Sequence, residues 1–416
     1  MRSRTLWGVA VAAAAMAAWA GEGEFPGEKE RGWFKCAQEI QRGNLGAAHE
    51  ALKEQGVEFA FALSLIWQAN HEGGVRSHPE GRTTASWDAG LRLDTERLGL
   101  WDGGAFFVHL EGSKGRGIDE RFVSSLLGVN GDADSTAGHR LQFSEYWFEQ
   151  AFADGLVAIR VGKMDATADF DTNAFANDEC TQFLNGALVN NPTIPFPDYG
   201  LGAQAVVRPG RGFYIAAGGW DANAEGWTSG RETALSGDAE WLMAVEAGAE
   251  VGIPVAGGTL PGNYRVGAWH DQRHFEEFGT ERRHKGESGW YLSFDQMVYK
   301  ESPDEKDEQG LGLFARYGHA PARYSEISHF WSFGTQYRGL IPSRDDDVVG
   351  AGFALGNLGG PARRELPHDC EAVCECYYCI VLHPVAALTL DLQYVRHPGA
   401  TYASSLVPGV RFHLEF

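Results

Sequence analysis

Apolar and polar residues alternate with a period of two over most of the chain beyond Val57. The run EFAFALSLIWQAN (58–70) places five large apolar side chains on one face and small or polar side chains on the other. The last residues, VPGVRFHLEF (407–416), repeat the pattern and end on an aromatic, Phe416. A period of two is the signature of a β-strand whose two faces meet different environments. The pattern therefore predicts an all-β fold.

Further runs of this kind follow in order and are bounded by Gly, Pro, Asn or Asp. They lie at 89–94, 105–111, 156–163, 263–270, 311–318, 331–338 and 387–395. Each is about the length of a membrane-spanning strand, which is roughly 9 to 11 residues. A soluble β-sandwich also alternates, but Arg, Asp, Glu and Gln on one face suit a wet lumen, and aromatic strand ends suit interfacial girdles. The pattern predicts a transmembrane antiparallel β-barrel whose apolar face contacts lipid.

The N-terminal region divides into two parts before the alternation begins. Residues 1–20 have a basic start, an apolar stretch and an Ala18-Trp19-Ala20 ending, which predicts a cleaved signal peptide and therefore export. Residues 21–56 form a periplasmic segment, in which LGAAHEALKEQ (45–55) predicts a short helix capped by Asn44 and ended by Gly56; an ordered tail is the alternative. Residues 57–416 are the predicted barrel.

Composition narrows the choice of partners. Without Arg2 and Arg4 the chain has 33 Lys and Arg against 56 Asp and Glu, a charge of −23, which argues against nucleic acid as a partner. Beyond residue 20 no apolar run approaches the roughly 20 residues of a spanning helix. The 54 glycines and 24 phenylalanines suit a chain with many turns and aromatic belts. Six cysteines are too few for a disulfide scaffold.

Several blocks resemble the OprB family of carbohydrate-selective porins. They include LDTERLGLWDGGAFFVHLEGSKG (93–115), GLVAIRVGKMDATADF (155–170), FLNGALVNNPTIPFPDYGLGAQAVVRP (183–209), GWYLSFDQMVY (289–299) and LDLQYVRHPG (390–399). The blocks extend in order from about Gly56 to Phe416. The resemblance implies a barrel of 16 strands in the outer membrane that lets sugars diffuse passively, with mono- and oligosaccharides as solutes and no cofactor.

The chain departs from the family pattern at three places. Leu390 stands where the family commonly has Pro before its Asp-Leu-Gln-Tyr motif. The strand CEAVCECYYCIVLHP (370–384) adds four cysteines, and the N-terminal helix lacks the Arg expected near Ala47 or Ala48. These departures leave the fold unaffected and bear on which solute passes.

Alternation nominates the residues that face the lumen. A sugar channel needs groups that hydrogen-bond hydroxyls and aromatic faces that pack on pyranose rings, with binding weak enough for release. The guanidinium fork of Arg is suited to paired hydroxyls and to carboxylates across a pore; an ion-paired wall residue is the alternative for each. The pore-lining candidates are Arg92, Arg160, Arg265, Trp269, Asp295, Arg316, Arg338, Asp391, Gln393 and Arg411.

Other polar motifs are weaker signals. SRDDD (343–347) is interpreted as a turn between strands, with a calcium site as the alternative, and 270–288 and 300–310 as solvated loops. Cys374 and Cys376 are predicted on the lipid face and Cys379 on the inner face, which works against a metal site, whereas a disulfide involving Cys36, Cys180 or Cys370 stays open. No catalytic or metal motif is found.

The sequence thus predicts an outer-membrane porin for carbohydrates that is not an enzyme. A general or cation-preferring pore is one alternative, and a plugged structural barrel or an outer-membrane lipase is another. We expect outer-membrane lipid to surround the barrel and the barrel assembly machinery to recognise Phe416. A homo-oligomer is an open possibility. Short turns and both termini are expected on the periplasmic side.

Overall fold

The computed structural model describes residues 44–76, 79–133, 139–255, 258–302, 307–360, 362–364 and 366–416, and the signal-peptide prediction lies outside them. Most of these residues are strands. In chain order the strands are β1 (Val57–Asn70), β2 (Glu72–Gly74), β3 (Glu80–Asp94), β4 (Gly104–Gly115), β5 (His139–Phe152), β6 (Val157–Met164), β7 (Gly200–Gly210), β8 (Phe213–Asp221), β9 (Trp241–Val255), β10 (Gly258–Glu276), β11 (Arg283–Lys300), β12 (Gly310–His319), β13 (Ile327–Arg338), β14 (Val348–Leu358), β15 (Cys370–His383), β16 (Ala386–Arg396) and β17 (Ala403–Glu415).

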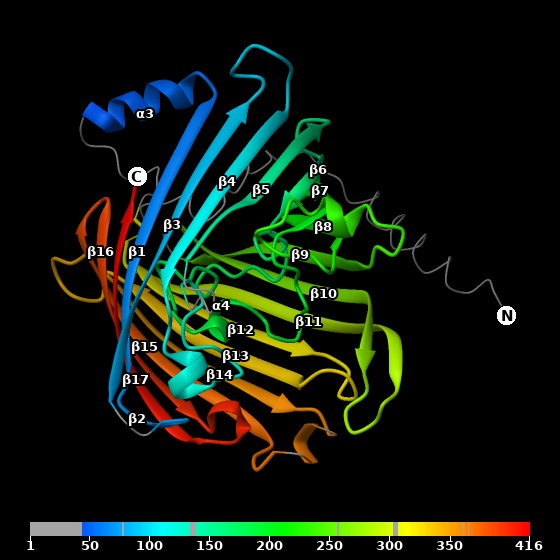
Figure 1. The fold of residues 1–416 in the computed structure, drawn as a ribbon. Coiled ribbons are helices and arrows are strands. Elements are labelled where there is room, and N and C mark those ends of the chain that lie inside the picture. Colours follow the sequence, from blue (N-terminus) through cyan, green and yellow to red (C-terminus); the bar gives the residue numbers. More distant parts are fainter. Residues whose placement is uncertain are drawn as a thin grey trace.

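Antiparallel pairing closes these strands into a barrel (Figure 1). Each long strand pairs with the next along the chain, and the ring closes where β1 pairs with both β3 and β17. The three-residue β2 only extends the edge of β17, so 16 strands form the wall. The prediction of a 16-stranded antiparallel barrel is confirmed.

Along each strand, buried and exposed positions alternate as the sequence predicts. In β1, Phe59, Phe61 and Leu65 are exposed on the outside, whereas Ser64 and Gln68 are buried on the inside. The C-terminal strand β17 buries every second residue as well. The backbones of Phe61 and Phe416 exchange two hydrogen bonds of 3.0 and 2.8 Å, which fix the terminal aromatic in the closing seam.

The connections differ between the two rims of the barrel. One rim has short turns, such as residues 211–212 and 384–385, and carries the N-terminal helix α3 (Asn44–Glu54) beside β1 (Figure 1). The predicted short helix is thus confirmed. The other rim carries the long connections 116–138, 165–199 and 222–240. We call these the short-turn rim and the long-connection rim; in outer-membrane barrels the short turns face the periplasm.

The strands β10 and β11 are longer than the sequence predicts. Residues 270–288 were expected to be a solvated loop, and this is wrong for most of the range. The two strands pair from Gly262 to Glu276 and from Arg283 to Gln296, interrupted by a bulge at Asp271 to His274, so that only 277–282 form the connection. The charged composition of 270–288 suggested a loop, but pairing between the two strands determines the structure here. An antiparallel sheet can expose polar side chains to water, so charged residues do not prevent strand formation outside the lipid.

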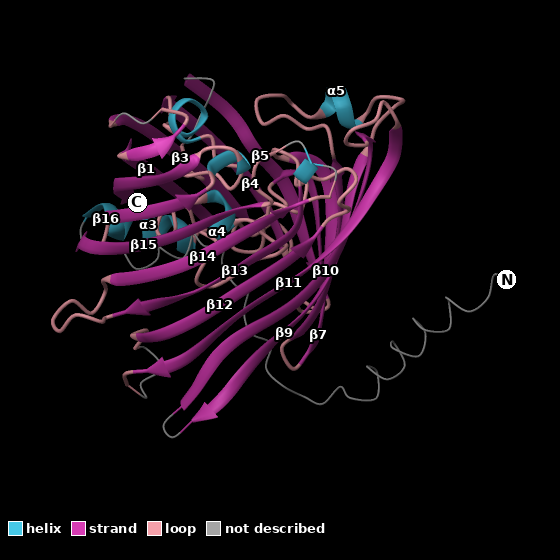
Figure 2. Cartoon of the chain, turned by 90° about the horizontal axis from the view of Figure 1, so that it is seen from below, coloured by secondary structure: helices cyan, strands magenta, loops and turns pink. Residues whose placement is uncertain are grey.

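Two long connections fold back into the barrel and form its core. The first inward segment (116–133) contains the short π-helical turn η1 (Asp119–Val123), and the second inward segment (165–199) contains α4 (Gly186–Val189). Figures 1 and 2 both show α4 enclosed by the strands. Phe122, Phe183 and Leu188 of these segments are buried against the inner face of β12 to β17.

The remaining helical elements lie among the connections: α5 (Arg231–Ala234), η2 (Ala362–Arg364) and η3 (Pro398–Ala400). Among the described residues, no helix is both long and apolar enough to cross a membrane.

Candidate functional site

The inner wall of β12 to β14 is shaped to receive the second inward segment. Glycines stand where that segment touches the wall. A Cβ at Gly318 would lie 2.1 Å from Thr193 Oγ1, and one at Gly312 would lie 2.2 Å from the ring of Phe175. No side chain fits such a gap, so glycine at these wall positions lets the segment lie flat on the strands.

Arg316 of β12 is the main basic anchor of the second inward segment. Its guanidinium is buried and donates to the backbone carbonyls of Leu188 (2.9 Å) and Asp171 (3.0 and 3.3 Å). It also pairs with the Asp171 carboxylate at 3.3 Å and donates to Asn177 Oδ1 at 3.1 Å. Burial raises the pKa of Asp171 to about 7, and Arg316 opposes this rise. One side chain thus joins three points of the segment.

Arg265 and Asp295 lie beside this anchor. Arg265 Nη1 donates to Asp295 Oδ2 at 2.9 Å, and the backbone N–H of Ala174 donates to the same oxygen at 3.2 Å. Asn263 donates to the other oxygen at 2.6 Å. The structure therefore brings the predicted residues Arg265, Asp295 and Arg316 together around one stretch of the inward segment.

Wall carboxylates hold the backbone amides of both inward segments. Glu375 accepts from the N–H groups of Leu184 (2.6 Å) and Asn185 (2.9 Å). Glu371 accepts from Leu126 and Leu127 of the first segment at 2.9 and 3.1 Å. Such charge-assisted bonds are stronger than neutral ones.

Glu246 plays the same part on β9. It accepts from the N–H of Asp171 at 2.9 Å and from the hydroxyls of Tyr214 and Tyr291 at 2.6 and 2.9 Å. Its position in the pairing register places it on the inner face of the wall, where it is fully buried.

Arg411, Gln393 and Asp391 form a second group on β16 and β17. Arg411 is fully buried and donates to the carbonyls of Glu179 (2.6 Å) and Gln182 (2.9 Å). Gln393 donates to Val129 O at 2.9 Å and to Asp391 Oδ1 at 3.1 Å. These side chains tie both inward segments to the closing strands.

Arg160 forms a third group on β6. It pairs with Glu149 at 2.5 Å and with Asp169 of the second inward segment. Its guanidinium lies 4.3 Å from the ring centroid of Trp147, within cation–π range. Gln204 donates to the same Asp169 carboxylate at 2.7 Å.

The other three predicted pore-lining residues lie apart from these groups. Trp269 faces inward and is buried in the cluster that contains Phe170 and Ile194. Arg338 lies at the short-turn rim and pairs with Glu308 and Asp346. Arg92 is half-buried, two residues from the end of β3.

Acidic side chains gather on the inward segments themselves. Burial raises the pKa of Glu179 well above its usual value, and the nearby charges of Asp178, Asp132 and Asp165 raise it further. Burial likewise raises the pKa of Asp132 to about 6. The alternation rule does not reach these groups because they lie outside the strands.

The cysteines and the turn at 343–347 bear on the weaker signals. Cys374 and Cys376 are exposed on the outer face and Cys379 is buried inside, as predicted. Cys180 and Cys370 are free thiols, and Cys36 lies outside the described residues. Within the described part of the chain, no group of three or more His, Cys, Asp or Glu side chains is placed to hold a metal ion. The predicted turn joins β13 and β14, with Asp347 held by Arg344 at 2.7 Å.

Two Ser–His contacts bear on the lipase alternative. On the outer face, His270 Nδ1 lies 2.8 Å from Ser288 Oγ. On the inner face, His413 Nδ1 lies 3.0 Å from Ser64 Oγ, with Glu415 3.6 Å from Nε2. Both Ser–His pairs are cross-strand neighbours, and the inner three side chains are buried in the wall. In a Ser-His-Asp hydrolase, Nε2 of the histidine bonds to the serine and an acid holds the Nδ1–H. In both contacts here the serine lies at Nδ1 instead.

Sequence reasoning overlooked the residues that anchor backbone rather than line a channel. Glu246, Glu371 and Glu375 are buried on the inner face, and each accepts backbone N–H groups. The available signal was an acidic residue at an inward position of an alternating strand. Such a residue, buried without an adjacent Lys or Arg, requires donors from elsewhere in the chain.

Comparison with known proteins agrees with the fold. The chain is 22% identical to Porin B of Pseudomonas aeruginosa over 90% of each protein. It is 24% identical to Porin AaxA of Chlamydia muridarum over 62% of this chain and 51% of that protein. The high-pH structure of OprB from Pseudomonas putida superposes with a TM-score of 0.77, at 20% identity, over 91% of this chain and 98% of that one.

A family model settles the assignment, because it covers most of the barrel. Residues 78–416 match the model described as carbohydrate-selective porin, OprB family. The 16-stranded antiparallel barrel and its apolar outer face accord with this match. The chain therefore belongs to the OprB family of carbohydrate-selective porins and is a porin of the outer membrane.

Proposed function

We propose that the channel passes mono- and oligosaccharides by passive diffusion through a constriction built by the two inward segments. The observation that carries this proposal is the anchoring of both segments to the wall by buried charged side chains, Arg316, Arg411, Glu371 and Glu375. Segments held in this way narrow the lumen to a fixed shape. Selectivity then needs no moving gate.

The wall groups suit weak sugar binding. The Arg160–Asp169 and Arg265–Asp295 pairs lie on the inner wall. Asp169 is the most exposed of the four side chains, at 21%, and the Nε–H groups of Arg160 and Arg265 have no hydrogen-bond partner among the described residues. Hydroxyls of a sugar replace the water lost on entry by bonding to such groups, and release remains fast because each bond contributes little net free energy. The proposed activity involves neither covalent chemistry nor a cofactor.

A cation-preferring pore is a second candidate function, favoured by one observation. Asp132, Asp165, Asp178 and Glu179 of the inward segments are close enough to interact electrostatically. Clefts lined by one sign of charge concentrate counter-ions. The two functions are compatible, since a sugar channel can also prefer cations over anions.

The test is single-channel conductance of the refolded protein in a planar bilayer, with sugars and amino acids titrated in. Concentration-dependent closure by sugars, and not by neutral amino acids, supports the proposal. Conductance steps that are cation-selective but insensitive to sugars contradict the sugar channel and support the cation-preferring pore. A folded barrel without conductance contradicts both candidate functions and favours the plugged structural barrel.

The expected partners follow from the surface of the barrel. Exposed apolar side chains such as Phe59, Trp67 and Val266 form an outer face suited to lipid. Phe416, fixed at the seam with β1, is the group that we expect the barrel assembly machinery to read. That role, and homo-oligomerisation, stay predictions.

A further inference from the structure

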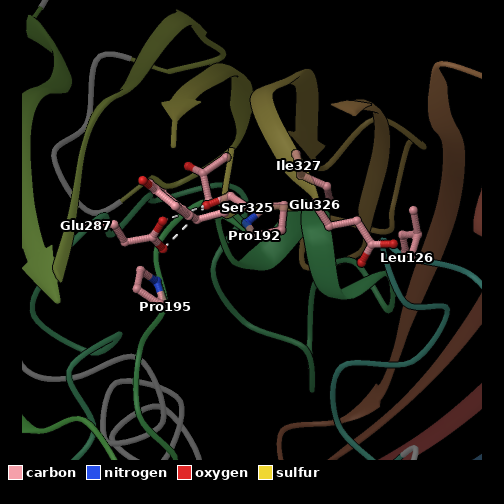
Figure 3. A pocket seen from close by; sticks show the side chains of 9 residues that line it. Leu126, Pro192, Pro195, Glu287, Ser325, Glu326 and Ile327 are labelled. Atoms are coloured by element: carbon pink, nitrogen blue, oxygen red, sulfur yellow. Dashed lines mark hydrogen bonds between the residues drawn. The ribbon is translucent and has the colours of Figure 1, made fainter. Parts of the chain in front are cut away.

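A separate pocket of about 270 Å³ lies near the long-connection rim, and Figure 3 shows the side chains that line it. It is bounded by Leu126 of the first inward segment, by Pro192, Thr193 and Pro195 of the second, by Glu287 of β11 and by 324–327 of the connection between β12 and β13. Its size is just below the range of about 300 to 1,000 Å³ for small-molecule sites, which suits a single sugar ring.

The walls of this pocket are held in place. The N–H of Leu126 donates to Glu371 at 2.9 Å. Thr193 bonds to Asn191 Oδ1 through its N–H (3.1 Å) and its hydroxyl (2.7 Å). The ring of Tyr324 stacks on His284 with centroids 5.1 Å apart and planes 8° apart. A preformed pocket binds its ligand with a smaller loss of conformational entropy.

Glu287 is the unusual member of the lining. Its side chain is 7% exposed, and its carboxylate receives the Ser325 hydroxyl at 3.1 Å, the contact drawn in Figure 3. Among the described residues no cation lies within ion-pair distance of this carboxylate; Arg273 acts on it from farther away and pairs with Asp271 at 2.6 Å. A carboxylate has about four acceptor positions, and a buried one with a single neutral donor is costly. A donor from a ligand would satisfy it.

The two charged side chains that line the pocket are both acids. Glu326 is the second acid of the lining, and no Lys or Arg belongs to it. The second inward segment, which supplies three residues of the lining, also carries Asp165, Asp178 and Glu179. An anionic solute is therefore repelled by these acids, whereas a solute with an ammonium group is attracted to them.

We propose that this pocket is a capture site for a single amino sugar, whose ammonium group binds Glu287 and whose hydroxyls bond to Ser325 and Glu326. Neutral hexoses bind there more weakly, and sugar acids are excluded. The inference rests on the proposed sugar-channel function, which it deepens by naming a preferred solute class. Tyr324 and the two prolines supply the apolar surface for the sugar ring.

The test compares glucosamine, glucose and glucuronate on the wild-type channel and on Glu287→Gln. A charge-assisted hydrogen bond is about twice as strong as a neutral one, so Glu287→Gln is expected to weaken glucosamine binding about tenfold and glucose binding less than about threefold. Glu308→Gln is the matched control, because Glu308 is an acid at the short-turn rim that pairs with Arg338. It is expected to leave all three solutes unchanged.

Two readouts separate this inference from the proposed function. Calorimetric binding to the detergent-folded barrel reports the pocket whether or not sugars are transported, and half-blocking concentrations in the bilayer report transport. Preferential loss of glucosamine binding in Glu287→Gln supports the site. If sugars block the wild-type channel, but Glu287→Gln weakens glucosamine and glucose binding equally or not at all, the site is overturned and the porin function stays intact. Absence of sugar block overturns the function, while calorimetry still decides the site. Heat-modifiable migration of each variant verifies that it is folded.

Discussion

Replacing Arg316 by Met removes the main anchor of the second inward segment with little change in side-chain volume. Arg316 is buried, and it bonds to Leu188 O, Asp171 O and Asn177 Oδ1 while pairing with the Asp171 carboxylate at 3.3 Å. The substitution leaves two carbonyls without these donors and the Asp171 carboxylate without its closest cation. The barrel itself is expected to stay closed, because its strands pair through the backbone.

The magnitude follows from the burial of the pair. Removing one partner of a buried ion pair costs up to about 3 to 5 kcal/mol when the other charge stays buried and uncompensated. Protonation of Asp171, whose pKa burial already raises to about 7, lowers this cost near neutral pH. At 1.4 kcal/mol for each factor of ten, the ratio of released to docked segment rises by up to about two to three and a half orders of magnitude. Asp171→Asn in the same chain removes that charge, so the double variant is expected to recover part of the loss.

The assay is single-channel recording together with hydrogen exchange of the amides at 183–190. Arg316→Met is expected to raise conductance, to add flicker and to speed exchange. Arg338→Met is the control: the Arg338 side chain is 26% exposed and pairs with more exposed acids, so the loss is expected to be below about 1 kcal/mol. Unchanged conductance and exchange in Arg316→Met would refute the view that this residue anchors the constriction.

Two further predictions concern charge and close packing. Burial raises the pKa of Asp132 to about 6, although the Ser86 hydroxyl opposes the rise, so its negative charge is lost as the pH falls through about 6. The cation-to-anion permeability ratio, measured from reversal potentials, should therefore fall in that pH range. In Asp132→Asn this ratio should be lower at neutral pH and should lack the pH-dependent step. A step of the same size in Asp132→Asn would assign it to other carboxylates. Gly318→Val places a Cβ 2.1 Å from Thr193 Oγ1, so we expect it to displace 191–195, at a cost of about 1 to 3 kcal/mol, and to lower glucosamine binding by calorimetry. Gly237→Ala, where no heavy atom lies within 4 Å of the added Cβ, should change nothing; equal effects of both would contradict the packing argument.

Alternation alone located the wall and its two faces. Phe412 and Arg411 were assigned to opposite faces from their spacing, and the structure has Arg411 buried inside and the side chain of Phe412 on the outer side. The side-chain direction in a strand is fixed by the local backbone, so a run of ten residues suffices to predict it. The length of β10 and β11 could not be predicted in the same way, because it depends on pairing between strands.

What occupies the inner face was decided by the tertiary structure. The sequence nominated Arg316 and Arg411 as groups that face the lumen, which is their phase in the strand, but both donate to backbone carbonyls of the second inward segment. Glu287 likewise acquired its pocket only when three connections met beside it. The period of a strand indicates which side a residue faces. The partner on that side comes from elsewhere in the chain, 128 residues away for Arg316 and Leu188 and 232 residues away for Arg411 and Glu179, and packing between such segments leaves no periodic pattern in either one.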